Sequence, residues 1–380
     1  MAQQHLEPPT DSPAGPMSGD ALAGYLRAQA TEFLRSLRQH RENGTDAGTS
    51  ARAKPRAESR AESRAESRDV SRDVSRAGEN GSGENGSGES VDAARALRRS
   101  ARRISGTLHT FRPLLDAEWS EGMRPELAWL SGTLAREHAY AARLERLLGA
   151  LNRLSGAAGL PAQAAQNTGA PAKGSLTVGA AKAGALLDRQ LTLARTRAHS
   201  AALQALGSSR FHAVADSVAV LASEVPLTPA AATADLRPLA AAATDRLTDA
   251  VTALPLVTAG HPYNAEALVH GLSADTAPHP QDAPWHQVRL LLRLHRYACE
   301  VLYGEDAPID VRLLRAGQAL NRHRDAAEAA AAAASAARTP RIAPATAYAL
   351  GVLHADQRHE VEAARFAFQQ NWQKETVRTP

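Results

Sequence analysis

Apolar residues recur at alternating steps of four and three along residues 95–115, a spacing typical of one face of an α-helix with ~3.6 residues per turn. A polar row accompanies them: five of its residues each follow an apolar residue by one position, and the sixth, Arg95, precedes the first apolar residue by two. Because one residue corresponds to a rotation of roughly 100°, the cations in this row flank the apolar face instead of pointing directly away from it. The apolar row is Leu97, Ala101, Ile104, Leu108, Phe111 and Leu115, and the polar row is Arg95, Arg98, Arg102, Ser105, His109 and Arg112.

Residues 285–302 repeat both rows. Positions 95, 98, 102 and 105 correspond to 286, 289, 293 and 296, with a constant offset of 191 residues. We therefore expect two helices that face each other across a cleft of uncompensated cations, which indicates a polyanionic ligand. The second apolar row is Trp285, Val288, Leu292, His295, Cys299 and Leu302, and the second polar row is His286, Arg289, Arg293 and Arg296.

The rest of the chain is predicted to be helical as well. No stretch shows a convincing period of two, so no sheet is expected. Pro226 and Pro229 separate two halves, 20–225 and 230–374, which we predict to have arisen by tandem duplication and to be related by pseudo-twofold symmetry. The further helices are expected at 21–40, 125–151, 180–206, 211–225, 236–254, 311–337, 345–353 and 357–374.

Two segments lack this periodicity. Residues 1–19 are proline-rich and are predicted to be a disordered tail. Residues 43–90 contain RAES three times, RDVS twice and GENGS twice, with few apolar side chains. Such a segment cannot bury enough apolar surface to offset the entropy cost of ordering, so we predict a disordered, low-complexity insert in the first half.

The amino-acid composition agrees with closely packed helices, and the positive charge is concentrated in one segment. Hydrophobic residues make up 43% of the 380 residues but aromatic residues only 4%, which favours packing through alanine and leucine. The formal net charge is only +4, yet residues 95–115 contain six arginines and no acidic residue. Cys299 is the only cysteine, the first residues show neither the basic nor the apolar region typical of a signal peptide, and no apolar run is long enough to span a bilayer. We expect a cytoplasmic protein without a membrane partner or a cofactor.

The motif His286-x2-Arg289-x3-Arg293-x2-Arg296-Tyr297-x2-Glu300 resembles the signature of the CHAD domain, the conserved histidine α-helical domain. Gln318-x-Leu320-x4-Asp325 is similar to the turn that follows this signature, and residues 98–115 and 347–372 resemble the opening and closing helices of the family. The resemblance covers residues 20–374 outside the insert. The chain departs from the family pattern at Arg95, Ser105, Ala139 and Leu294, and it is identified as a divergent, stand-alone member.

The resemblance implies two four-helix bundles around a central basic channel that binds inorganic polyphosphate, and association with polyphosphate granules. Arginine suits phosphate because its planar fork donates two parallel hydrogen bonds and stays charged. The histidines are open to a second interpretation: His286 as a polar boundary residue, His109 and His323 as structural residues. The candidate binding residues are Arg95, Arg98, Arg102, Arg103, His109, Arg112, His286, Arg289, Arg293, Arg296 and His323.

Two other function classes fit less well. A nucleic-acid-binding helical protein would also need basic stripes, but these stripes carry no interleaved exposed aromatic residues for base stacking. A polyphosphate or phosphate-ester hydrolase would need paired carboxylates to hold a metal, and the sequence offers only Asp325 and Glu300 beside the stripes. Neither a HExxH motif nor a P-loop is present. We therefore expect a binding protein and no enzyme.

Overall fold

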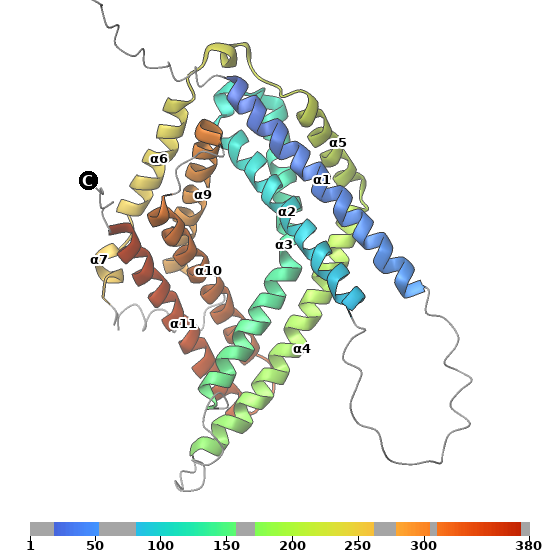
Figure 1. Cartoon of the computed structure of the whole chain (residues 1–380). Coiled ribbons are helices and arrows are strands. Elements are labelled where there is room, and N and C mark those ends of the chain that lie inside the picture. Colours follow the sequence, from blue (N-terminus) through green and yellow to red (C-terminus); the bar gives the residue numbers. More distant parts are fainter. Residues whose placement is uncertain (1–18, 53–80, 157–171, 262–278, 305–309, 374–380) are drawn as a thin grey trace, which may run out of the picture.

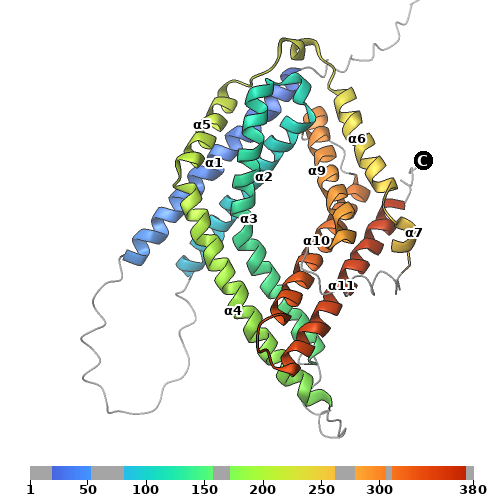
Figure 2. The same ribbon diagram turned by 180° about the vertical axis from the view of Figure 1, so that it is seen from behind.

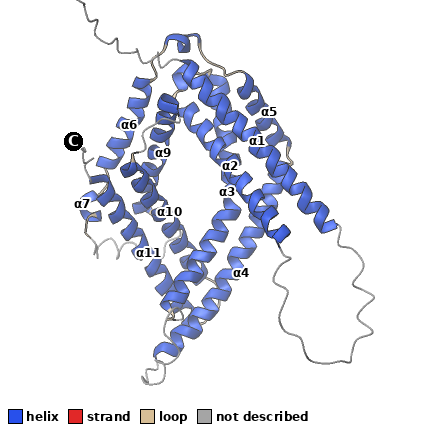
Figure 3. Ribbon diagram, in the orientation of Figure 1, coloured by secondary structure: helices blue, strands red, loops and turns tan. Residues whose placement is uncertain are grey.

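A computed structural model describes residues 19–52, 81–156, 172–261, 279–304 and 310–373. These residues form helices joined by short turns and contain no strand, which confirms the predicted all-α class (Figure 3). The helices are α1 (Gly19–Arg52), α2 (Gly81–Thr110), α3 (Ala117–Leu154), α4 (Ala172–Leu206), α5 (Ser209–Ser223), α6 (Arg237–Thr252), α7 (Leu256–Ala259), α9 (Ala283–Tyr303), α10 (Val311–Ala337) and α11 (Pro344–Gln373).

Several helix ends differ from the sequence prediction. Helix α3 begins at Ala117 and not at Pro125, because the carboxylate of Asp116 caps it by accepting a hydrogen bond from the Trp119 backbone N–H at 2.8 Å. Pro125 then lies inside the helix. Helix α11 is continuous where two segments, 345–353 and 357–374, were expected.

The boundaries predicted for the insert also need correction. Helix α1 continues to Arg52 and helix α2 begins at Gly81, so helix covers both ends of the segment 43–90. Extending an existing helix costs much less than nucleating one, which accounts for growth into a segment with little apolar surface. The centre of the segment, 53–80, and most of the predicted tail lie outside the described residues, and their disorder stays a prediction.

The helices form a four-sided frame that is visible from both directions (Figures 1 and 2). Helices α1, α2 and α5 follow one upper side, and α6 and α9 follow the other. The pair α3 and α4 and the pair α10 and α11 converge at the opposite end. The site discussed below lies where α2 meets α9.

Three main apolar clusters hold this frame together. The first joins α1, α2, α5 and the beginning of α3 with parts of α6 and α9, and it contains the whole apolar row of residues 97–115 at 2% exposure or less. The second joins the end of α3 with α4, α10 and α11. The third joins α6, α7 and α9 with the beginning of α10 and Phe368 of α11. Burial of one face of α2 fixes the direction in which its arginines point.

Candidate functional site

Helices α2 and α9 touch at Gly106. A Cβ atom at this position would lie 2.6 Å from Tyr297 Cδ2 and 3.2 Å from Leu294 Cδ2. Because carbon atoms do not pack this closely, only glycine permits the approach. The contact brings the polar row of α2 into the neighbourhood of the polar row of α9.

Four arginines form the centre of the site, Arg98 and Arg102 on α2 and Arg289 and Arg293 on α9. All four are half-buried, and the Nε atom of each is buried without a hydrogen-bond partner among the described residues. A buried donor without a partner costs free energy, and a buried unpaired charge costs more. We refer to these four residues as the arginine cluster.

Burial and mutual repulsion act on every member of the arginine cluster. Burial, followed by repulsion from Arg102 and Arg324, lowers the pKa of Arg98 to about 10. Burial, followed by repulsion from Arg293 and Arg324, lowers the pKa of Arg289 to about 9. The charge on Arg102 also contributes to lowering the pKa of Arg293 on the other helix. The two polar rows therefore share one electrostatic environment, which a bound anion would stabilise.

Arg324 of α10 is a further cation at this site, and it was missed in the sequence. Its charge contributes to lowering the pKa of every member of the arginine cluster. Its guanidinium is held by Asp325 and lies 3.8 Å from Glu328. A signal was present, because Arg324 directly precedes Asp325 in the stretch Gln318-x-Leu320-x4-Asp325, which is similar to the turn that follows the family signature.

Carboxylates neutralise several of the other predicted arginines, contrary to the expectation of uncompensated rows. Arg103 donates to both oxygens of Glu300, at 2.7 and 3.2 Å, and Arg296 lies 3.2 Å from the same carboxylate. Arg95 donates to Asp92 at 3.0 Å. Arg112 lies 2.9 Å from Glu121. These four arginines are thus less available to a ligand than the arginine cluster.

The predicted histidines occupy different environments. His286 is half-buried beside Arg289, and its Nε2 atom has no partner among the described residues. His323 is 1% exposed and lies behind His286, with ring centroids 5.5 Å apart. Arg365 Nε donates to His323 Nε2 at 3.3 Å, and the ring stacks on Trp285. Direct ligand contact therefore suits His286, whereas His323 is part of the buried structure.

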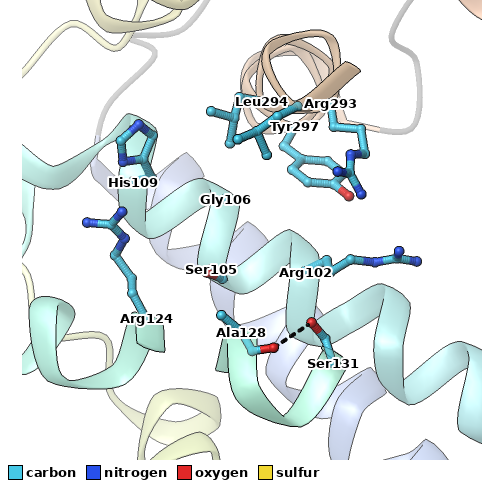
Figure 4. A pocket seen from close by; sticks show the side chains of 11 residues that line it. Arg102, Ser105, Gly106, His109, Arg124, Ala128, Ser131, Arg293, Leu294 and Tyr297 are labelled. Carbon is cyan, nitrogen blue, oxygen red and sulfur yellow. Dashed lines mark hydrogen bonds between the residues drawn. The ribbon is translucent and has the colours of Figure 1, made fainter. Parts of the chain in front are cut away.

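A pocket of about 230 Å³ adjoins the arginine cluster (Figure 4). Arg102 and Arg293 belong both to the cluster and to the pocket lining, while His109 and Arg124 lie at its other end. His109 is the one predicted histidine that lines it. The remaining lining residues come from α2, α3 and α9: Ser105, Gly106, Ala128, Ser131, Leu290, Leu294 and Tyr297.

The described residues offer neither a metal site nor a membrane span. No group of three or more histidine, cysteine, aspartate or glutamate side chains is placed to hold a metal ion within the described ranges. In the same part of the chain, no helix is both long and apolar enough to cross a membrane.

Fold and site together define an all-helical protein in which two crossing helices share a cluster of partly buried arginines. The chain belongs to the CHAD domain family, which matches residues 82–334. The solved structure of PptA from Streptomyces chartreusis is 68% identical in sequence and has a TM-score of 0.71. The alignment covers 95% of this chain and 100% of PptA. A search of curated proteins found no match. The resemblance seen in the sequence is thereby confirmed.

Proposed function

We propose that this protein binds inorganic polyphosphate at the arginine cluster. The observation that carries the proposal is the set of four partly buried guanidinium groups, each with an Nε atom that lacks a partner among the described residues. Phosphate oxygens would accept from these donors and offset the repulsion among the arginines. Polyphosphate binding is also the function that the resemblance to the CHAD family implies.

The ligand we propose is a chain of phosphates and not a single ion. Arg98 and Arg102 are one helical turn apart, about 6 Å along α2, and Arg289 and Arg293 repeat that spacing on α9. Arg324 extends the positive region to α10. A linear polyanion can contact these positions at once, so that the affinity gains from several weak contacts on one molecule.

Pseudo-twofold symmetry is part of the proposal. The offset of 191 residues pairs Gly106 with Tyr297, the residues at which α2 and α9 touch. It also pairs Arg98 with Arg289 and Arg102 with Arg293. In this arrangement α1–α4 correspond to α6 and α9–α11, α5 is an addition to the first half, and a central basic channel runs between the two polar rows.

Binding without catalysis is the activity we propose, in the cytoplasm and on polyphosphate granules. Nucleic acid is the competing ligand, since its backbone also carries regularly spaced phosphates. Base stacking would need exposed aromatic rings, and Tyr297, the aromatic residue of the pocket lining, is only 5% exposed. The buried Tyr297 ring thus offers no platform on which successive bases could stack, which favours polyphosphate over a nucleic-acid strand.

A competition experiment tests the proposal. Long-chain polyphosphate, single-stranded DNA and double-stranded DNA are titrated at equal phosphate concentration against a fluorescent polyphosphate probe, at several salt concentrations. We expect polyphosphate to compete best and its affinity to fall steeply with salt, because each neutralised phosphate releases condensed counterions. Preference for DNA, or affinity that does not change with ionic strength, would overturn the proposal.

A further inference from the structure

The pocket beside the arginine cluster has an apolar wall that a phosphate chain alone would not use. Leu290 of α9 lines it and is 44% exposed, so it leaves apolar surface open to solvent beside a concentrated positive charge. Leu294 continues the wall, Gly106 of α2 meets it at the helix contact, and Ala128 of α3 lies on the opposite side. Apolar surface gains free energy only when it is covered by apolar or aromatic atoms. The wall therefore points to a ligand that carries more than phosphate.

Cations lie at both ends of this apolar surface (Figure 4). Arg102 and Arg293 are at one end, where the pocket opens onto the arginine cluster. His109 and Arg124 are at the other end, where the guanidinium of Arg124 is held by Glu121 at 3.2 Å, and both carry planar groups that can stack on a heterocyclic ring. Ser105 and Ser131 add hydroxyl groups between the two ends. Such a lining suits a ring system with hydrogen-bonding edges and a phosphate tail.

The pocket volume limits the size of the ring system. Pockets for drug-sized ligands are roughly 300–1,000 Å³, and this one is smaller, at about 230 Å³. It has room for a nucleoside but not for a nucleoside together with several phosphates. The phosphates of such a ligand would have to extend out of the pocket, in the direction of the arginine cluster.

We propose that this pocket binds the nucleoside part of a nucleoside 5′-polyphosphate, with the phosphates on Arg102 and Arg293. The inference rests on the proposed function, because it uses two arginines of the same cluster. It adds a second class of ligand, a nucleotide, which would compete with the end of a polyphosphate chain for these two residues. Occupancy by polyphosphate would then respond to the nucleotide concentration.

The test compares ATP with inorganic tripolyphosphate by calorimetry, at fixed ionic strength and without divalent cations. Both probes carry three phosphates, and tripolyphosphate carries at least as much negative charge, so charge alone cannot favour ATP. We expect ATP to bind at least fivefold more tightly, because the nucleoside covers the exposed side chain of Leu290. The variant Leu290→Ser should remove most of this preference and leave the affinity for tripolyphosphate unchanged.

A matched control is Leu193→Ser, which changes a leucine of similar exposure, 48%, on the distant helix α4. It should alter neither affinity. Equal binding of ATP and tripolyphosphate by the unmodified protein would overturn the nucleotide inference, and so would a Leu290→Ser variant that keeps the preference for ATP. If long-chain polyphosphate and tripolyphosphate both fail to bind, the proposed function fails, whatever the result with ATP.

Discussion

Asp282, whose side chain is only 2% exposed, is the most buried carboxylate near the site. It lies beside His323, and the ring of His323 in turn packs behind His286. Arg358 donates to Asp282 at 2.8 Å and Arg365 at 2.7 Å, and His323 Nε2 lies 3.4 Å away. Burial would raise the pKa of Asp282, but these contacts outweigh burial and hold its pKa well below the usual range. A buried carboxylate paired in this way is costly to disturb.

Acid sensitivity is expected from His323. Burial lowers its pKa from 6.5 to about 4, so the folded protein holds this ring neutral while the unfolded chain protonates it below pH 6.5. The unfolded state therefore binds more protons in this window, and stability falls as the pH decreases from 6.5 to 4. Between pH 7.5 and 5 the loss from this one group is about 2 kcal/mol.

Urea unfolding of the wild type and of His323→Gln at pH 7.5 and pH 5 measures this effect. The variant is expected to be less stable at pH 7.5 but to lose about 2 kcal/mol less on acidification. His212→Gln, at an exposed position on α5, serves as the control and should behave like the wild type. The same pH dependence in wild type and His323→Gln would contradict the assignment.

Local patterns could be predicted from the sequence, whereas contacts between residues far apart in the chain could not. The stripes containing Arg98, Arg102, Arg289 and Arg293 could be predicted, because helical periodicity is a local property. The pairing of Arg103 with Glu300 could not, since it joins residues 197 positions apart through the contact of α2 with α9. The same holds for His323, whose burial depends on residues from α9 and α11.

At the scale of the helices, the close contact of α2 with α9 depends on Gly106. A methyl group there would have to displace Tyr297, whose ring edge lies 2.6 Å from the Cβ position. Overpacking of this kind costs about 1–3 kcal/mol, which exceeds the gain of at most about 1 kcal/mol from replacing glycine by alanine in a helix. The two arginine pairs would move apart as well.

We therefore expect Gly106→Ala to lower both the thermal stability and the affinity for polyphosphate. Gly132→Ala in α3 is a matched control, because nothing lies within 4 Å of its Cβ position. This second variant should gain about 0.5–1 kcal/mol from helix propensity and keep its affinity. Differential scanning calorimetry and a polyphosphate titration measure the two effects. A Gly106→Ala protein as stable as Gly132→Ala would show that the helices can adjust without cost.

The helices themselves were largely predictable, but their ends were not. Apolar periodicity located α2 and α9 correctly, and both are amphipathic helices with one buried face. Pro125 predicts a helix start because proline favours the first turn, whereas the helix is capped by the carboxylate of Asp116, nine positions earlier. Local capping signals compete with each other, and the sequence alone does not decide between them.

At the scale of the whole molecule, the alanine-rich end of α10 has a structural role that composition did not reveal. Ala329, Ala333 and Ala336 are fully buried in the second apolar cluster, together with Leu147 of α3 and Leu350 of α11. Small side chains allow α10 and α11 to approach closely. Helices of the first half thus share a core with helices of the second half, so the two halves assigned from the sequence do not have separate cores.

The shared core makes the relative position of the two arginine pairs a property of the entire fold, and the equivalence of the pairs can be tested. Arg98 and Arg102 on α2 form one wall of the proposed channel, and Arg289 and Arg293 on α9 form the other. Charge-assisted hydrogen bonds contribute roughly 1.5–3 kcal/mol each, and 1.4 kcal/mol corresponds to one decade in affinity. A double Arg→Ala change in either wall should therefore weaken polyphosphate binding at least tenfold.

Folding should change little in these variants, since the buried apolar rows are untouched. Removing the two arginines of one helix also relieves their repulsion of the two arginines on the other helix. Arg189/Arg197→Ala, which removes two exposed arginines of α4, is the control for net charge and should reduce the affinity much less. We expect Arg289/Arg293→Ala to have the larger effect, because burial and repulsion lower the pKa of Arg289 to about 9 and that of Arg98 only to about 10, so a phosphate relieves more unfavourable free energy in the second wall. Titration of polyphosphate into all three proteins decides the matter: if neither wall variant loses affinity while both remain folded, the arginines do not bind the ligand and the proposed function is wrong.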